Sequence, residues 1–169
     1  EPYDCPQKPF GGDEDYIFSP DGKKVIYVSK KKAGTAYATS TNTNLYEYYI
    51  ESKTTKNLTE KNLGYDIAPQ FSPTGDLSWL QMKQDGYEAD KNDIIVRHKG
   101  LDINLTSNWD GTVDSFIWSK DGKNVYFIAA VDGTKQLFEV NFPGLTKIMI
   151  RINQITKGDF DINGFVGFD

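Results

Sequence analysis

The chain has 169 residues, enough for one domain with its own core, and 38% of them are hydrophobic. Acids and bases are spread along the sequence and give a net charge of -5 and an isoelectric point near 4.9, without the basic patch typical of nucleic-acid binding. Cys5 is the sole cysteine, which excludes an internal disulfide and a zinc site built from several cysteines.

Targeting and membrane segments are not recognisable in the sequence. No apolar run approaches the roughly 20 residues that a membrane-spanning helix needs. The polar start EPYDCPQKPF lacks the basic and apolar regions of a signal peptide. We therefore expect any export signal of the parent protein to lie outside this chain.

A thirteen-residue pattern occurs three times, as FSPDGKKVIYVSK at 18–30, FSPTGDLSWLQMK at 71–83 and WSKDGKNVYFIAA at 118–130. Each copy has an aromatic residue and serine, then a turn triplet, then a run of β-branched and aromatic residues. In the triplets proline presets φ, Asp or Thr can bond back to the backbone, and glycine takes the positive φ that closes a hairpin. The pattern predicts three hairpins.

A third and a fourth strand are predicted after each hairpin. The third strands read NLYEYYI, DIIVRH and QLFEVNF, and the polar turns ESKTTK, KGLD and FPGL follow them. A shorter fourth strand ends in NLT at 57–59, NLT at 104–106 and QIT at 154–156. Each unit is therefore predicted to be a four-stranded antiparallel meander.

The period of the repeat indicates the fold. Phe18, Phe71, Trp118 and Phe168 are separated by 53, 47 and 50 residues. A period near fifty with four strands per unit is typical of a β-propeller, each unit being one blade. A β-sandwich gives no reason for such a repeat, and the β-branched and aromatic runs contradict an all-α solenoid.

We therefore predict an all-β fold, an incomplete β-propeller of four-stranded antiparallel blades. Blade 1 is expected at about 13–60, blade 2 at about 65–107, blade 3 at about 113–157 and the start of blade 4 at about 160–169. Because propellers have typically four to eight blades, we expect the chain to be a piece of a larger protein.

Residues typical of catalysis are scarce. No G-x-S-x-G is present to hold a serine nucleophile, and His98, the only histidine, is expected to be an exposed residue at the end of a strand. No calcium loop or glycine-rich phosphate loop occurs, so neither a metal nor another cofactor is expected.

Three further features are the NLT segments, the two tryptophans on predicted strands and the tryptophan in a loop. The NLT segments at Asn57 and Asn104 fit the glycosylation pattern, but their equivalent places in the fourth strands favour a structural role. Trp79 and Trp118 lie on predicted strands and are expected to pack between blades. Trp109, in the loop SNWDGTVD, is expected to be exposed.

Three segments resemble a known family: YVSKKKAGTAYATSTNTNLYEY, KNLTEKNLGYDIAPQFSPTG and MKQDGYEADKND. They resemble the propeller of the prolyl oligopeptidase family of serine peptidases, closest to the bacterial dipeptidyl peptidases and acylaminoacyl peptidases. The resemblance covers residues 8 to 169. The FSPDG turn occurs in many unrelated propellers, whereas the DGYEADKN loop together with YATSTNTN is more specific.

The resemblance implies a propeller that caps an α/β-hydrolase domain with a Ser-Asp-His triad and filters peptide substrates. No triad residue can be assigned in this chain, which is therefore expected not to be catalytic by itself. The implied partners are the C-terminal α/β-hydrolase domain of the same parent protein and peptides that lose dipeptides or acyl-amino acids from their N-termini. No nucleic-acid partner is expected, and the implied location is periplasmic or secreted.

In related dipeptidyl peptidases, propeller loops facing the active site can carry acids that hold the amino terminus of the peptide. By resemblance these loops are 60–67, 107–114 and 157–165, with 30–43 and 84–92 on the same face, and none carries the double-Glu helix of the dipeptidyl peptidase IV subgroup. The substrate-binding candidates are Tyr87, Glu88, Asp90, Asp66, Trp109, Asp110 and Asp114.

Two alternatives stay open at this point. A loop acid such as Glu88 or Asp90 can instead bond to Lys91 or cap the local backbone. The whole chain can instead be an interaction propeller without enzymatic function, like the periplasmic one of the Tol system. The long acidic DGYEADKN loop favours the peptidase, because an interaction propeller has no evident need of it.

Overall fold

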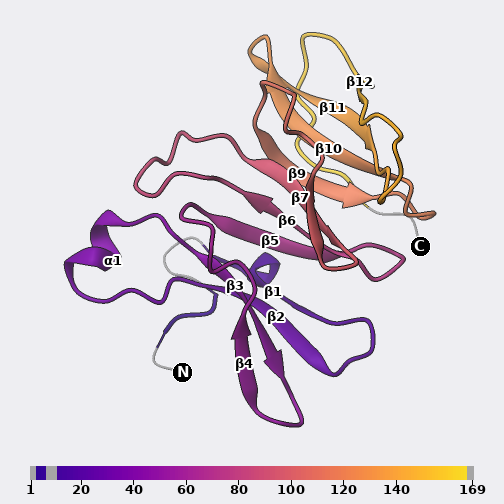
Figure 1. The fold of residues 1–169 in the computed structure, drawn as a ribbon. Helices are drawn as coiled ribbons and strands as arrows, with labels where there is room; N and C mark the ends of the chain where they lie inside the picture. Colours follow the sequence, from indigo (N-terminus) through magenta and orange to yellow (C-terminus); the bar gives the residue numbers. More distant parts are fainter. Residues whose placement is uncertain (1–2, 7–10, 167–169) are drawn as a thin grey trace. The chain divides into compact units, whose positions relative to one another are not determined.

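A computed structural model describes residues 3–6 and 11–166 (Figure 1). The strands form three four-stranded antiparallel sheets, each of strands consecutive in the sequence. The first contains β1 (Tyr16–Phe18), β2 (Lys24–Ser29), β3 (Asn44–Tyr49) and β4 (Thr54–Asn57). The second contains β5 (Asp66–Phe71), β6 (Leu77–Gln81), β7 (Asp93–His98) and β8 (Leu101–Asn104). The third contains β9 (Val113–Trp118), β10 (Asn124–Val131), β11 (Thr134–Asn141) and β12 (Ile152–Gln154).

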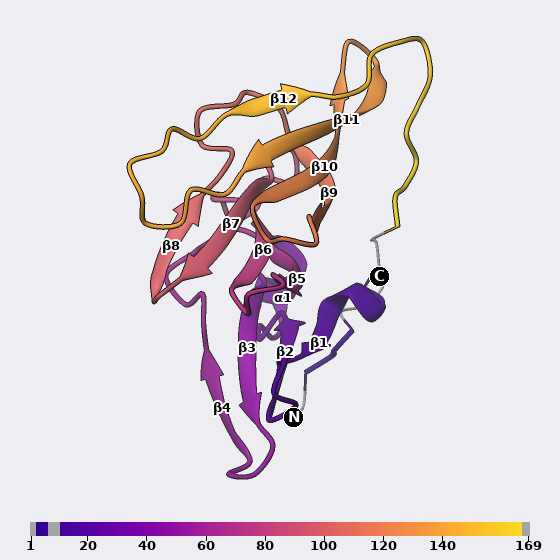
Figure 2. The ribbon, with the colours of Figure 1, turned by 90° about the vertical axis from the view of Figure 1, so that its right-hand side faces the viewer.

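The three meanders agree with the predicted all-β fold. Figure 2 shows the strands of the first sheet side by side in chain order. The short helix α1 (Thr35–Thr39) lies in the long connection between β2 and β3, and a 3-10 turn, η1 (Asp13–Asp15), precedes β1. In the part of the chain that the structure describes, no helix has the length and apolar character to cross a membrane.

The chain divides into two compact units. Unit 1 comprises residues 1–71 and 79–90, and unit 2 comprises residues 72–78 and 91–169. The core of unit 1 contains Ile26, Val28, Leu45, Trp79 and Leu80, and that of unit 2 contains Ile94, Val96, Phe116, Phe127 and Val140.

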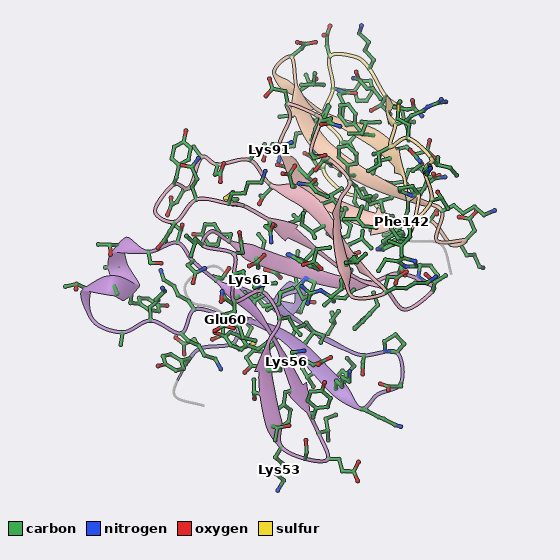
Figure 3. All side chains as sticks on the ribbon, in the orientation of Figure 1. Lys53, Lys56, Glu60, Lys61, Lys91 and Phe142 are labelled. Atoms are coloured by element: carbon green, nitrogen blue, oxygen red, sulfur yellow. The ribbon has the colours of Figure 1, made fainter. Side chains whose placement is uncertain are left out.

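The turn triplets form the hairpins that their residues predict. Ser19 Oγ donates to Asp21 Oδ1 over 2.6 Å, and the same bond joins Ser119 to Asp121 over 2.8 Å. The glycines that follow have φ of 68° and 69°, which side chains disfavour. In the turn between β3 and β4 the residue with positive φ is not a glycine but Lys53, with a φ of 55°. Figure 3 shows this lysine at the tip of the turn.

The fourth strands end earlier than predicted, because the repeated threonine bonds to the third strand through its side chain. β4 stops at Asn57, and the Thr59 hydroxyl accepts the backbone N–H of Leu45 over 3.0 Å. In the second sheet the Thr106 hydroxyl accepts the N–H of Ile94 over 3.1 Å. The hydroxyl takes the place of a strand carbonyl, so a buried N–H stays paired after the strand has ended.

The asparagines of the NLT segments also have structural partners. Asn57 Oδ1 accepts the N–H two residues later over 3.0 Å, and its Nδ2 donates to Asn44 Oδ1 over 3.0 Å. Asn104 repeats both bonds, over 2.9 Å each, with Asp93 as its acceptor. These contacts agree with the structural interpretation of the pattern.

The aromatic residues of unit 2 confirm one prediction and correct another. Trp118 is half-buried, and its Nε1–H donates to Ser78 Oγ over 2.9 Å, in agreement with packing between strands of two sheets. His98 does end β7, but it is not exposed: its Nδ1 lies 2.9 Å from Asp76 Oδ1, and its ring meets Phe142 edge-on. The sequence predicted an exposed histidine at the end of the strand, but side chains from other elements of unit 2 cover it.

The end of the chain does not test the fourth blade. Phe168 and Asp169, where its first strand is expected, lie outside the described residues. Residues 160–166 form no strand, although the Ile162 N–H donates to the Lys135 carbonyl over 2.8 Å. The limits of the blades and the start of blade 4 stay predictions.

Candidate functional site

Three loops of unit 1 come together through polar side chains, and we call them the unit 1 loop cluster: residues 30–43, 58–65 and 82–90. The first link is the carboxylate of Asp85, whose Oδ1 accepts hydrogen bonds from Ser40 Oγ (2.7 Å), Thr41 N (2.7 Å) and Asn42 N (3.2 Å). The Gly86 N–H donates back to Thr41 Oγ1 over 2.9 Å. These hydrogen bonds hold the pKa of Asp85 below its ordinary value, and the bond from Ser40 has the largest effect.

Two asparagine side chains join the remaining loop. Asn42 Nδ2 donates to the carbonyls of Asn62 (3.1 Å) and Gly64 (3.2 Å). Asn62 Nδ2 in turn donates to the Met82 carbonyl over 2.8 Å. A Cβ on Gly64 would lie 2.4 Å from that same carbonyl oxygen, so the close approach of the two loops requires glycine there.

Asp66 lies beneath the loop cluster with no exposed surface. Its Oδ1 accepts the indole N–H of Trp79 and the Nε2–H of Gln81, each over 2.8 Å, and its Oδ2 accepts Asn62 Nδ2 over 3.1 Å. Burial outweighs these donors and raises the pKa of Asp66 to about 6. The structure therefore places this candidate beneath the loops, where its carboxylate has no access to solvent.

Glu88 and Tyr87 lie at the exposed part of the cluster. Tyr87 is 50% exposed and Glu88 is also exposed. Nearby, burial and the negative charge of Glu88 raise the pKa of the half-buried Tyr65. Within the described residues the Glu88 carboxylate has no ion-pair partner, so it is available to a cation from solution.

Asp90 closes the base of the same loop. Its Oδ2 accepts the backbone N–H groups of Lys83 (2.8 Å) and Gln84 (2.9 Å), and its own N–H donates to the Tyr87 carbonyl over 3.1 Å. This is the local backbone capping considered as the alternative for a loop acid. Lys91, labelled in Figure 3 just before β7, reaches Asp93 Oδ1 over 2.8 Å.

The other candidates lie in the segment 107–114 of unit 2, a loop that runs into the start of β9. Trp109 is half-buried rather than exposed as predicted, because its ring packs at 5.2 Å from Phe127 and 5.3 Å from Phe138, centre to centre. Asp110 is exposed, and Asp114 Oδ2 lies 2.6 Å from Lys135 Nζ. Of these three, Asp110 alone offers both exposure and a charge that no described ion pair holds.

The candidates thus form two sets. Tyr87, Glu88 and Asp90 share one loop of unit 1, above Asp66, whereas Trp109 and Asp110 share one loop of unit 2 and Asp114 lies at the start of β9. The sequence analysis missed Asp85 and its partners, although the DG pair and the run of small polar residues in ATSTNTN are signals of turns and backbone capping. Among the described residues, no group of three or more His, Cys, Asp or Glu is placed to hold a metal ion.

Comparison with known proteins gives relatives along the whole chain. No family model matches. The chain is 39% identical over 168 residues to dipeptidyl-peptidase 5 of Porphyromonas gingivalis and 40% identical over 172 residues to dipeptidyl-peptidase 5 of Porphyromonas endodontalis. These matches cover 98% and 100% of this chain and 24% of each relative, so the chain spans about a quarter of the length of the curated relatives it matches. The resemblance to dipeptidyl peptidases is confirmed.

Among solved structures, TolB from Acinetobacter baumannii is similar over 90% of this chain and 35% of its own, with a TM-score of 0.56. The sequence identity is 18%, which shows a likeness of fold and nothing more. Together with the three four-stranded sheets, this likeness confirms the predicted β-propeller class.

Proposed function

We propose that this chain is part of the β-propeller of a dipeptidyl peptidase and forms one wall of the chamber that receives the peptide. The observation that carries the proposal is the identity of 39% and 40% to two dipeptidyl-peptidase 5 proteins along the whole chain. Those relatives are about four times as long, which leaves room for an α/β-hydrolase domain with the Ser-Asp-His triad in the parent protein. The chain itself performs no chemistry.

In this proposal the unit 1 loop cluster binds the amino end of the peptide. An ammonium group that leaves water needs a charge-assisted partner, and the unpaired carboxylate of Glu88 is such a partner. The exposed ring of Tyr87 adds a face on which a cation is attracted. Holding the amino end at a set distance from the nucleophile determines that cleavage follows the second residue.

The alternative is a propeller that binds a protein partner and takes no part in catalysis. It is supported by the likeness to TolB, which at 18% identity concerns the fold alone. The identity to the dipeptidyl-peptidase 5 proteins is about twice as high, and therefore favours the peptidase. We assign the periplasm or the extracellular space as the location, in line with the family resemblance.

The test uses the full-length parent protein and chromogenic peptides with either a free or an acetylated amino terminus. The parent is expected to release dipeptides from the free peptides. Glu88→Gln is expected to raise the KM for these about tenfold, since it loses a charge-assisted hydrogen bond. The KM for acetylated peptides stays unchanged, because they carry no ammonium. A parent that hydrolyses no peptide contradicts the proposal, and a pull-down of protein partners would follow.

A further inference from the structure

We infer that Asp85 is a positioning residue for peptide binding: it fastens the loop that carries Tyr87 and Glu88 onto residues 40–42, and so sets the affinity for the amino end of the substrate. The inference rests on the proposed function, because it concerns the same site. It assigns a role to a side chain that does not itself meet the peptide.

The geometry of the fastening is specific. A single carboxylate oxygen, Asp85 Oδ1, accepts hydrogen bonds from one hydroxyl and two backbone N–H groups, all from the three consecutive residues 40–42. The Gly86 N–H returns a fourth bond to the Thr41 hydroxyl. Bonds to a carboxylate are stronger than bonds between neutral groups, so one side chain accounts for much of the attachment.

Glu88 lies between this fastening and a second one. On the N-terminal side Asp85 fixes the loop to residues 40–42. On the C-terminal side Asp90 closes it onto the N–H groups of residues 83 and 84. The loop is otherwise exposed from residue 83 to residue 89. Without the Asp85 carboxylate, residues 85–88 would keep the bonds made by Asp90 and the one from the Gly86 N–H to the Thr41 hydroxyl, but would lose three of the four bonds to residues 40–42.

The fastening also links the loop that carries Glu88 to the segment around Tyr65. Asn42, which donates its N–H to Asp85, is bonded through its side chain to the carbonyls of Asn62 and Gly64, next to Tyr65. The charge of Glu88 acts on the Tyr65 phenol. Asp85 therefore attaches the loop of Glu88 to residues that are bonded next to Tyr65, and a loosened loop would present Glu88 over a range of positions with a weaker average attraction for an ammonium group.

Asp85 itself is exposed, so its removal leaves no cavity in the core. The test compares the full-length parent with Asp85→Ala, with the conservative Asp85→Asn and with Asp121→Ala. Asp121 is a matched control, because it is an exposed aspartate that bonds a serine hydroxyl (Ser119, 2.8 Å) and a backbone N–H (Lys123, 3.0 Å) in a hairpin turn.

We expect hydrogen exchange of the amides of residues 84–89 to be about tenfold faster in Asp85→Ala, while the thermal midpoint of unfolding stays near that of the parent. The KM for free-amine dipeptidyl substrates is expected to rise about tenfold, with kcat within about a factor of two. Asp85→Asn keeps an acceptor oxygen and should recover part of both changes. Asp121→Ala should change neither.

Several outcomes would overturn the inference, and Glu88→Gln separates it from the proposed function. Unchanged exchange at residues 84–89 in Asp85→Ala shows that Asp85 does not fasten the loop. Faster exchange with an unchanged KM, while Glu88→Gln raises KM, keeps the proposed function and removes the role of Asp85. If neither variant changes the KM of an active parent, both Glu88 and Asp85 lose their roles. A parent without peptidase activity removes the proposed function, and the role of Asp85 with it.

Discussion

The indole N–H of Trp79 donates a 2.8 Å hydrogen bond to Oδ1 of Asp66, and neither residue has any exposed surface. The bond joins the first strand of the second sheet to its neighbour directly below the unit 1 loop cluster. A buried carboxylate at this place couples the stability of the loops to pH.

The first prediction concerns this coupling. Burial raises the pKa of Asp66 to about 6 in the folded protein, above its ordinary value of 3.8, so the folded state binds the proton more tightly than the unfolded state. The stability contributed by this group is complete below pH 3.8 and is lost as the pH rises through about 6; its full size is about 3 kcal/mol. Asp66→Asn is expected to flatten this pH dependence. Thermal unfolding of the parent and the variant between pH 4 and 7 measures it, and parallel curves for the two proteins would contradict the prediction.

A second prediction concerns the threonine that follows the fourth strand. Thr106→Val keeps the shape of the side chain but removes the hydroxyl that accepts the Ile94 N–H and donates to Asp93 Oδ1 over 2.7 Å. Because the Ile94 N–H loses its acceptor in a buried site and Asp93 Oδ1 loses one of its donors, the variant should lose about 1–3 kcal/mol of stability. Thr54→Val, at an exposed position of β4, is the control and should change stability by less than about 0.5 kcal/mol. Equal effects of the two substitutions in denaturant unfolding would refute the structural role of the threonine.

A third prediction uses the glycine beside Trp109. A Cβ at Gly111 would lie 2.3 Å from the indole ring, so Gly111→Ala must displace the ring from Phe127 and Phe138. Overpacking of this kind costs about 1–3 kcal/mol. The matched control is Gly164→Ala, since nothing lies within 4 Å of its added Cβ. The thermal midpoint should fall for the first variant and stay unchanged for the second, and a stable Gly111→Ala protein would mean that the ring is free to move.

The fourth prediction concerns the glycosylation pattern. The side chains of Asn57 and Asn104 are half-buried and bonded on both their oxygen and their nitrogen. A glycan would replace one hydrogen of Nδ2 and would have to fit beside the Asn44 or Asp93 side chain that this nitrogen contacts. When the parent protein is secreted from a eukaryotic host, we expect neither asparagine to be modified. Intact-mass measurement before and after glycosidase treatment tests this expectation. A glycan mapped to Asn57 or Asn104 would contradict the prediction.

The sequence by itself determined the repeating hairpins and their period. Proline, aspartate and glycine set the turn at residues 19–22 through their own φ preferences and one short-range bond, so neighbours along the chain were sufficient. The long loop with Tyr87 and Glu88 could also be recognised, because its length and its residues are properties of one segment.

The tertiary structure decided which of the candidate residues are available. Asp66 is buried and Trp109 and His98 are covered because strands and loops distant in the sequence pack onto them, and no local pattern records such packing. The fastening of the loop depends on Ser40 and Asp85, which are 45 residues apart. The turn preference of an aspartate can be read from its neighbours, but its hydrogen-bond partner across that separation exists only once the first and second sheets have formed.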